Sequence, residues 1–159
     1  MFKLDSEEAL LASFRPKDRK LVELTPEVQP PIFVRDYVAW AHPAGGRIYL
    51  LFVTPGGAPT GIVFDGKTGG GGPGVPVPAM CDWCHSHSVG TGVGLLTATV
   101  NAKKRIGVHA CADLSCKAKL EEEANRSGRS VVPAIQKLIE RMGKFASDGL
   151  GIDLSGVTR

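Results

Sequence analysis

The sequence predicts an α+β fold in which an antiparallel β meander packs with helices and is joined to a cysteine-rich, metal-binding part. Three observations predict this arrangement. Residues 47–54 (RIYLLFVT) form a strongly strand-like run, four cysteines occur in two close pairs, and apolar residues recur at helical spacing after Ser130. The length of 159 residues is within the usual range for a single domain.

A short helix is expected near the N-terminus. Asp5 and Glu8 have the spacing of a capping box, and the apolar residues between Leu10 and Phe14 supply a face that can be buried. Residues 15–31 contain four prolines, so this segment is predicted to be largely irregular.

The β meander is expected over residues 32–64. Residues 33–40 are rich in aromatic and β-branched side chains, and residues 47–54 and 60–64 give two further strands. The sequence His-Pro-Ala-Gly-Gly at 42–46 is typical of a turn between the first two strands. Consecutive strands with short connections favour antiparallel pairing.

Residues 66–78 differ sharply in composition from their surroundings. They contain four consecutive glycines and three prolines, and such a stretch cannot bury enough side chain to hold a fixed shape alone. We therefore predict a mobile loop that leads into the metal site.

The second half is expected to contain a β-hairpin and two helices. Residues 95–100 and 105–110 read as the two strands of the hairpin, with residues 101–104 as its turn. A helix should start near Cys116 and end before Gly128. Ser130 is a suitable N-cap for the last helix, and its apolar face is Val131, Ile135, Leu138, Ile139, Met142 and Phe145.

The cysteine spacing predicts one structural zinc ion held by Cys81, Cys84, Cys111 and Cys116. A C-x2-C pair bends the backbone so that both sulfurs reach one ion, and a second pair on another element completes a tetrahedral shell. The first pair follows a flexible loop and forms a knuckle, while the second pair joins the end of the hairpin to the start of a helix. Knuckle, hairpin and helix in that order indicate a treble-clef zinc finger.

The cysteines admit other interpretations. They could be ordinary buried thiols, although two close pairs make this a weaker explanation. A redox C-x-x-C site, or a switch that releases zinc on oxidation, is a further alternative. His85, His87 or His109 could each replace one sulfur, because a set of three cysteines and one histidine is also common.

Residues 61–68 match the phosphate-loop pattern G-x-x-x-x-G-K-[ST]. That motif needs a strand before the loop and a helix that begins at the lysine. Here the variable residues Ile62 to Asp65 read as the strand itself, and a glycine run and a proline follow. We therefore reject nucleotide binding. With no nucleophile, base and orienting group standing out either, the chain is not expected to be an enzyme or to bind a small-molecule substrate.

Composition and charge bear on whether the chain is a membrane, secreted or nucleic-acid-binding protein. No apolar run reaches the length of a membrane helix, and the acidic N-terminal residues argue against a signal peptide, so a cytoplasmic location is expected. In that compartment four cysteines would stay reduced. The net charge of +3 permits an acidic partner but does not demand nucleic acid, and we find no dense basic patch with interleaved aromatic residues.

Residues 80–116 carry a more specific signal. The pieces CDWCHS, GVGLLTATV and GVHACADLSC resemble the C-terminal treble-clef zinc-finger domain of elongation factor G-binding proteins of the FusB type. In that family a C-x2-C-H knuckle is followed by a hairpin and by C-[AT]-D-x-x-C. The four cysteines match the metal positions of the family, and Asp113 and Leu114 match its inter-cysteine motif.

The resemblance implies a single domain of this type over residues 1–159. Its parts would be a helix and meander at 1–65, a loop at 66–79, the treble clef at 80–127 and a C-terminal helix at 130–149. It also implies a non-enzymatic role in translation, with elongation factor G and the ribosome as partners and promotion of factor release, as in fusidic acid resistance. The chain departs from larger members, which carry an N-terminal helical domain.

Candidate partner-binding residues follow from the predicted structure. Lys103, Lys104 and Arg105 would form a basic hairpin tip suited to an acidic protein surface or to rRNA phosphates, and Phe145 lies near the end of the last helix. A solvated turn and a core phenylalanine are the plainer interpretations of these residues. Because the basic tip would also suit rRNA phosphates, the main alternative function is rRNA binding by a treble-clef protein.

Overall fold

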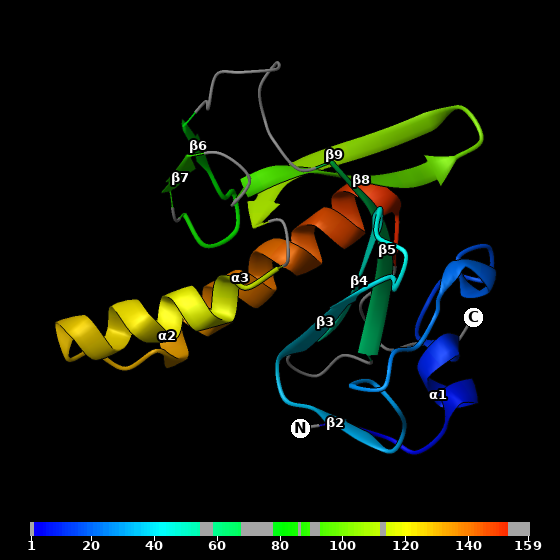
Figure 1. The fold of residues 1–159 in the computed structure, drawn as a ribbon, viewed down its shortest axis with the longest axis horizontal. Helices are drawn as coiled ribbons and strands as arrows, with labels where there is room; N and C mark the ends of the chain where they lie inside the picture. Colours follow the sequence, from blue (N-terminus) through cyan, green and yellow to red (C-terminus); the bar gives the residue numbers. More distant parts are fainter. Residues whose placement is uncertain are drawn as a thin grey trace.

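The computed structural model describes residues 2–54, 59–67, 78–85, 87–89, 93–111 and 114–152. Its centre is a five-stranded antiparallel sheet in the order β3-β4-β5-β8-β9 (Figure 1). The strands are β3 (Tyr37–Ala41), β4 (Arg47–Val53), β5 (Pro59–Lys67), β8 (Val93–Asn101) and β9 (Lys104–Cys111). The predicted α+β class with an antiparallel meander is confirmed.

One short stretch of pairing joins the meander to the cysteine-rich half. Strand β5 pairs with β8 through Asp65–Thr97, Gly66–Leu96 and Lys67–Leu95. The hairpin β8–β9 therefore continues the sheet that the meander begins. The connecting residues 68–77, which make up most of the predicted loop, lie outside the described part of the chain.

Smaller elements surround the sheet. Strands β1 (Phe2–Leu4) and β2 (Ile32–Val34) pair with each other, as do β6 (Pro78–Met80) and β7 (His87–Val89). The helical elements are α1 (Glu7–Ala12), the 3-10 turn η1 (Arg19–Leu21), α2 (Cys116–Ser127), α3 (Val132–Lys144) and the π-helical turn η2 (Phe145–Gly149). Among the described residues, no helix combines the length and hydrophobicity needed to cross a membrane.

Several local expectations need correction. The run 33–40 is broken before Tyr37, because the carboxylate of Asp36 accepts a hydrogen bond from the Tyr37 N–H at 2.6 Å and β2 turns away to pair with β1. Helix α1 is capped by Ser6, whose Oγ accepts from the Ala9 N–H, and not by Asp5.

The two ends of the long loop and the start of the last helix also differ by a few residues. Gly66 and Lys67 extend β5, and Pro78 begins β6. Helix α3 has Val131 at its N-cap position, while the Ser130 Oγ accepts a hydrogen bond from the Val132 N–H at 3.2 Å. The residues of the rejected phosphate-loop pattern up to Lys67 lie within β5.

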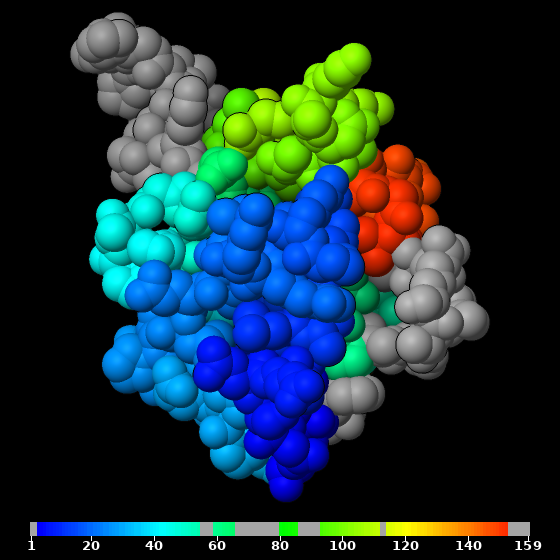
Figure 2. All heavy atoms as spheres, turned by 90° about the vertical axis from the view of Figure 1, so that its right-hand side faces the viewer, coloured from blue at the N-terminus to red at the C-terminus, as the bar shows by residue number. Residues whose placement is uncertain are grey.

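The sheet is buried on both faces over β3, β4 and β5, which explains why residues 47–53 are almost uniformly apolar. One face packs against α1, β1 and β2, with Trp40, Tyr49 and Phe14 at its centre. The other face packs against α3 and the cysteine-rich segments. The molecule thus has an N-terminal layer, a sheet and a C-terminal layer. The hairpin β8–β9 extends past the edge of the N-terminal layer (Figures 1 and 2).

The contact between Phe14 and Gly61 holds the N-terminal layer on the sheet. The Gly61 N–H donates to the Ser13 carbonyl at 2.9 Å, and a Cβ placed on Gly61 would lie 2.6 Å from three atoms of the Phe14 ring. That ring is buried, so it has no open space to move into. Glycine is therefore required here by close packing.

We predict that Gly61→Ala destabilises the protein by about 1–3 kcal/mol, because overpacking displaces the buried ring. Gly107→Ala is the matched control, since its Cβ would meet the flexible end of the exposed Leu95 side chain. Urea denaturation measures both free energies of unfolding. Equal effects of the two substitutions would contradict this account of Gly61.

Candidate metal centre

The first cysteine pair lies in a tight turn between β6 and β7. The His85 N–H donates to the Cys81 carbonyl at 2.8 Å, and the Cys84 N–H points at the Cys81 sulfur at 3.4 Å. Asp82 fixes this turn against β9, because its N–H donates to the His109 carbonyl at 2.7 Å and its carboxylate accepts from the His109 N–H at 3.2 Å. The knuckle is thus attached to the hairpin at two points.

The second pair joins the end of β9 to the start of α2. Cys111 is the last residue of the strand, and Cys116 is the first residue of the helix. Between them, Leu114 adopts φ of 55° and its N–H donates to the Cys111 carbonyl at 2.8 Å.

The four sulfur atoms form a compact group in which all lie within 4.8 Å of one another. Cys81 and Cys116 have their sulfurs 3.7 Å apart, and those of Cys84 and Cys111 are 3.6 Å apart. A tetrahedron with Zn–S bonds of about 2.3 Å has edges of about 3.8 Å, so the spacing matches a zinc shell. A disulfide would need about 2.05 Å.

Protonation of the thiols is strongly interdependent. Hydrogen bonds from the thiols of Cys116 and Cys81 lower the pKa of Cys111 to about 6, and hydrogen bonding with Cys111 raises the pKa values of Cys81 and Cys116. Zinc binds thiolates, so its binding must release the remaining thiol protons. The Lys119 ammonium, 3.2 Å from the Cys111 sulfur, offsets part of the negative charge that results.

The four cysteines form a zinc-binding site, and their chemistry defines its type. Cys81, Cys111 and Cys116 are fully buried, and Cys84 is partly so. Four sulfur ligands fill a tetrahedral shell, which is typical of zinc that stabilises a fold. When bound, the ion would cross-link the knuckle, the end of β9 and the start of α2.

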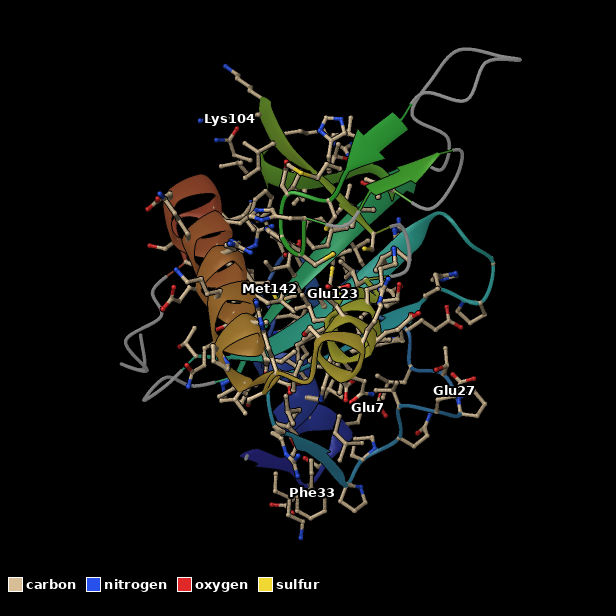
Figure 3. All side chains as sticks on the ribbon, turned by 90° about the vertical axis from the view of Figure 1, so that its left-hand side faces the viewer. Glu7, Glu27, Phe33, Lys104, Glu123 and Met142 are labelled. Atoms are coloured by element: carbon tan, nitrogen blue, oxygen red, sulfur yellow. The ribbon has the colours of Figure 1, made fainter. Side chains whose placement is uncertain are left out.

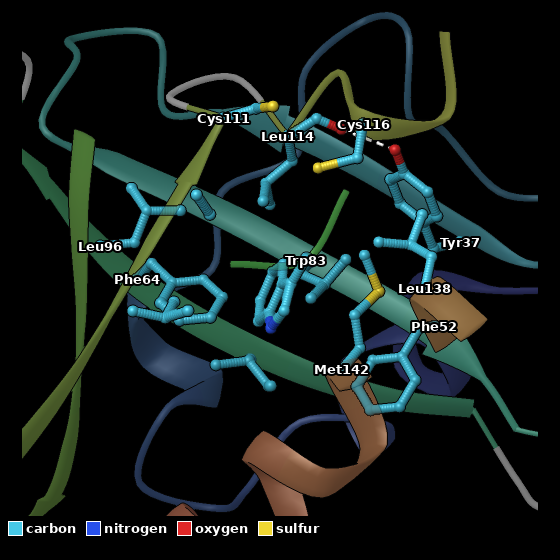
Figure 4. Close-up of a cluster of buried hydrophobic side chains, with 14 of the residues drawn as sticks. Tyr37, Phe52, Phe64, Trp83, Leu96, Cys111, Leu114, Cys116, Leu138 and Met142 are labelled. Carbon is cyan, nitrogen blue, oxygen red and sulfur yellow. Dashed lines mark hydrogen bonds between the residues drawn. The ribbon is translucent and has the colours of Figure 1, made fainter. Parts of the chain in front are cut away.

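A hydrogen-bonded bridge from β3 holds the second half of the site. The Tyr37 hydroxyl donates to the Leu114 carbonyl at 2.7 Å (Figure 4) and also accepts from the Lys117 N–H at 2.8 Å. The Lys117 ammonium also pairs with the buried carboxylate of Asp36 at 2.8 Å. Burial raises the pKa of Tyr37, so its phenol stays protonated and able to donate well above neutral pH.

Trp83 anchors the first half of the site in the core. Its ring packs beside Phe64 (Figure 4) and Phe145, with centroid separations of 5.9 Å to each, and these two rings are 5.6 Å apart. The Arg141 guanidinium on α3 donates to the Trp83 carbonyl at 2.6 Å. The two residues between the cysteines of the knuckle therefore have separate tasks: Asp82 binds β9, and Trp83 fills the core.

Among the described side chains, the predicted histidine ligands and the predicted partner-binding residues lie outside the group of four sulfurs. His85 and His109 are exposed and lie outside the sulfur group, and the side chain of His87 is not among those described. Lys103, Lys104 and Arg105 are exposed at the free end of the hairpin β8–β9, where Figure 3 labels Lys104. Phe145 is half-buried in the aromatic cluster with Trp83 and Phe64.

Tyr37, Lys119 and Arg141 are supporting residues that sequence reasoning missed. Tyr37 lies 80 residues before its partner Lys117, so no local pattern connects them. A lysine three positions after a helical cysteine returns to the same face of the helix, and this spacing was the available signal for Lys119.

We predict one zinc ion per chain in wild type and its loss in Cys111→Ser, because removing one thiolate opens a shell that otherwise stabilises the fold. His85→Ala and His109→Ala should both retain the ion, since neither side chain belongs to the sulfur group. Elemental analysis with thermal melting checks this. Zinc loss in either histidine variant would show that the shell contains an imidazole.

We further predict that Tyr37→Phe destabilises the protein by about 1–3 kcal/mol, because the buried Leu114 carbonyl and the part-buried Lys117 N–H lose their partner. The same change should weaken zinc binding about tenfold, as expected when a supporting residue is removed. Tyr49→Phe is the control, because its hydroxyl bonds the Leu21 carbonyl on the opposite side of the sheet. Competition with a zinc chelator measures the affinities, and equal losses in both variants would contradict the bridge.

The chain is similar to known zinc-finger proteins. The family described as FBP C-terminal treble-clef zinc-finger matches residues 11–147. Among solved structures, the fusidic acid resistance protein FusC is 19% identical, with a TM-score of 0.48 over 74% of this chain and 50% of that chain, so this chain spans about half the length of FusC. No curated protein matches the chain. Since the family match covers most of the chain and all four clustered cysteines, the chain belongs to the FBP C-terminal treble-clef zinc-finger family, the FusB-type group that the residues around the cysteines predict.

Proposed function

We propose that this protein is a zinc-stabilised binding module that contacts elongation factor G on the ribosome and promotes release of the factor. The observation that carries the proposal is the family match over residues 11–147, which includes the complete four-sulfur site. Elongation factor G is the partner that the FusB-type resemblance implies. We place this protein in the cytoplasm, where its cysteines would remain reduced and able to bind zinc.

The proposed role is binding and not catalysis. Four sulfur ligands leave no open coordination position at which zinc could activate water or a substrate. The ion would instead hold the knuckle and the hairpin in one relative orientation. A preorganised surface loses less conformational entropy on association, which favours partner binding.

The outer face of the hairpin β8–β9 supplies a contact surface beside the zinc site. Leu95 pairs with His109 across the hairpin, and its side chain extends over Gly107, where a Cβ would lie only 2.9 Å from it. Leu95 remains 38% exposed, and Met80, directly before the knuckle, is 42% exposed. Exposed apolar side chains of this kind would supply buried apolar area to a protein interface.

Protection against fusidic acid is a separate part of the proposal. In the FusB-type resemblance it accompanies release of the factor from the ribosome. Because this chain spans about half of the FusC length, factor binding and protection should be measured independently.

We predict that purified elongation factor G binds the zinc-loaded protein and that Leu95→Asp weakens this binding about tenfold, as when an apolar interface residue is replaced by a charge. Chelation of zinc should abolish the interaction because the hairpin and knuckle are then no longer held together. Isothermal titration calorimetry measures both effects.

Val132→Asp is the matched control, because Val132 is an exposed apolar residue at the start of α3, away from the hairpin. This variant should bind like wild type and retain its zinc. If wild type fails to bind the factor, both free and on ribosomes, the proposed function is wrong. If Leu95→Asp binds unchanged, the contact surface lies elsewhere.

A further inference from the structure

Two basic segments that are far apart in sequence lie side by side. Residues 15–20 (RPKDRK) pack against the end of strand β8, where the Arg15 guanidinium donates to the Thr99 carbonyl at 2.7 Å and the Lys17 ammonium donates to the Val100 carbonyl. Figure 2 shows the blue N-terminal segment against the yellow-green hairpin. The turn at 15–20 and the tip of the hairpin therefore form one continuous surface.

This basic surface carries six exposed cations. Arg15 is not counted, because it is largely buried and pairs with the buried Asp18 at 2.8 Å, which cancels both charges. Asp65, which pairs with both Arg105 and Arg47, is a carboxylate at the edge of the surface. The six residues are Lys17, Arg19, Lys20, Lys103, Lys104 and Arg105.

The charge of the chain is therefore unevenly distributed. Six cations and Asp65 give the basic surface a net charge of +5, while the whole chain carries +3, so all remaining residues together sum to −2. Cations within a Debye length of about 8–10 Å act together on a charged partner. The hairpin tip, which is a run of consecutive basic residues in the sequence, contributes only three of these six cations.

The surroundings of these cations favour one kind of partner. Across the described residues, the exposed large hydrophobic side chains are Phe33, Met80, Leu95 and Val132, and all four lie outside the basic surface. A stable protein interface needs an apolar or aromatic centre, and a membrane surface site needs apolar anchors. Flexible lysines without such a centre suit the dispersed charge of a phosphate chain.

The hairpin tip is also held in a defined shape. Asn101 pairs with Lys104 to close the turn, and the Asn101 side chain accepts a hydrogen bond from the Lys103 N–H at 2.8 Å. In Figure 3, Lys104 projects from the free end of this hairpin. Both halves of the surface are therefore anchored by contacts to the backbone. On the N-terminal half, the Lys17 ammonium and the Arg19 guanidinium make these contacts themselves, although both residues remain exposed. The Arg19 guanidinium donates to the Leu11 and Phe14 carbonyls.

We infer that the basic surface binds the sugar–phosphate backbone of single-stranded RNA, without reading its base sequence. The choice of RNA rests on the proposed function, because a protein that acts on the ribosome works beside RNA. The phosphate contact itself rests on the charges and packing alone. The turn at 15–20 and the hairpin tip would each contact phosphates of the same strand.

The test uses the full zinc-loaded chain and a labelled oligouridylate of about 20 nucleotides, with fluorescence anisotropy between about 50 and 200 mM salt. Wild type should bind with a steep salt dependence. The doubles Lys17→Gln/Lys20→Gln and Lys103→Gln/Lys104→Gln should each bind about tenfold more weakly at low salt and flatten the slope by about 1.4, which is two phosphate contacts on a single strand.

The control is Lys137→Gln/Lys144→Gln, which removes the same charge from exposed positions on α3. It should bind like wild type, and all variants should retain zinc and their circular dichroism spectrum. Unchanged binding by the Lys17/Lys20 variant, or an equal loss in the α3 control, would overturn the shared surface.

Two further arms separate the possible partners. A polyglutamate peptide should bind far more weakly than RNA, and equal affinity would identify an acidic protein as the partner and overturn the inference. Leu95→Asp should bind RNA like wild type. If this variant loses elongation factor G binding and keeps RNA binding, both proposals are supported. If wild type fails to bind RNA, the inference about the basic surface is wrong and the proposed function is unaffected.

Discussion

Four thiolates that share one zinc ion connect segments up to 35 residues apart, and most features of the C-terminal half depend on this link. The knuckle contributes Cys81 and Cys84, while β9 and α2 contribute the other two sulfurs. Without the ion, four crowded thiols must share protons through mutual hydrogen bonds. With it, the same crowding becomes a set of coordinate bonds, so the free energy of metal binding is also free energy of folding.

The link reaches beyond the zinc finger because the sheet is continuous. Strand β8 pairs with β5 on one side and β9 on the other, so the metal site is attached to the meander through hydrogen bonds. Tyr37 adds a second attachment from β3 to the start of α2. Two independent connections resist rotation of the zinc finger about the short β5–β8 pairing. The hairpin is thereby presented at a fixed angle to the rest of the molecule.

Patterns that are local in sequence predicted their structures well. The hairpin strands, the helix after Cys116 and the apolar face of α3 all depend on neighbours within a few residues, and Leu138, Ile139 and Met142 are indeed buried. The four cysteines could be predicted as metal ligands for the same reason, because each of the two pairs has a recognisable local spacing. Short strands β1, β6 and β7 were missed, because three residues are too few to show a period.

Features that depend on distant residues could not be predicted. Tyr37 lies 80 residues from Lys117, and Lys17 lies 83 residues from Val100, so neither contact leaves a local signal. The absence of a dense basic patch in the sequence was for this reason a poor guide to the surface. Charge that is divided between two short segments becomes concentrated only when the sheet brings them together.

The positions of the two tryptophans give the molecule a natural pair of optical probes. Trp83 lies in the core on the zinc side of the sheet, against Phe64 and Phe145, whereas Trp40 lies in the opposite core against Tyr49 and Phe14. Indole emission responds to local polarity, so each ring reports on its own layer. A chain with Trp40 replaced by Phe would leave a single emitter beside the knuckle, and loosening of the metal-bound layer could then be followed while the N-terminal layer stays folded.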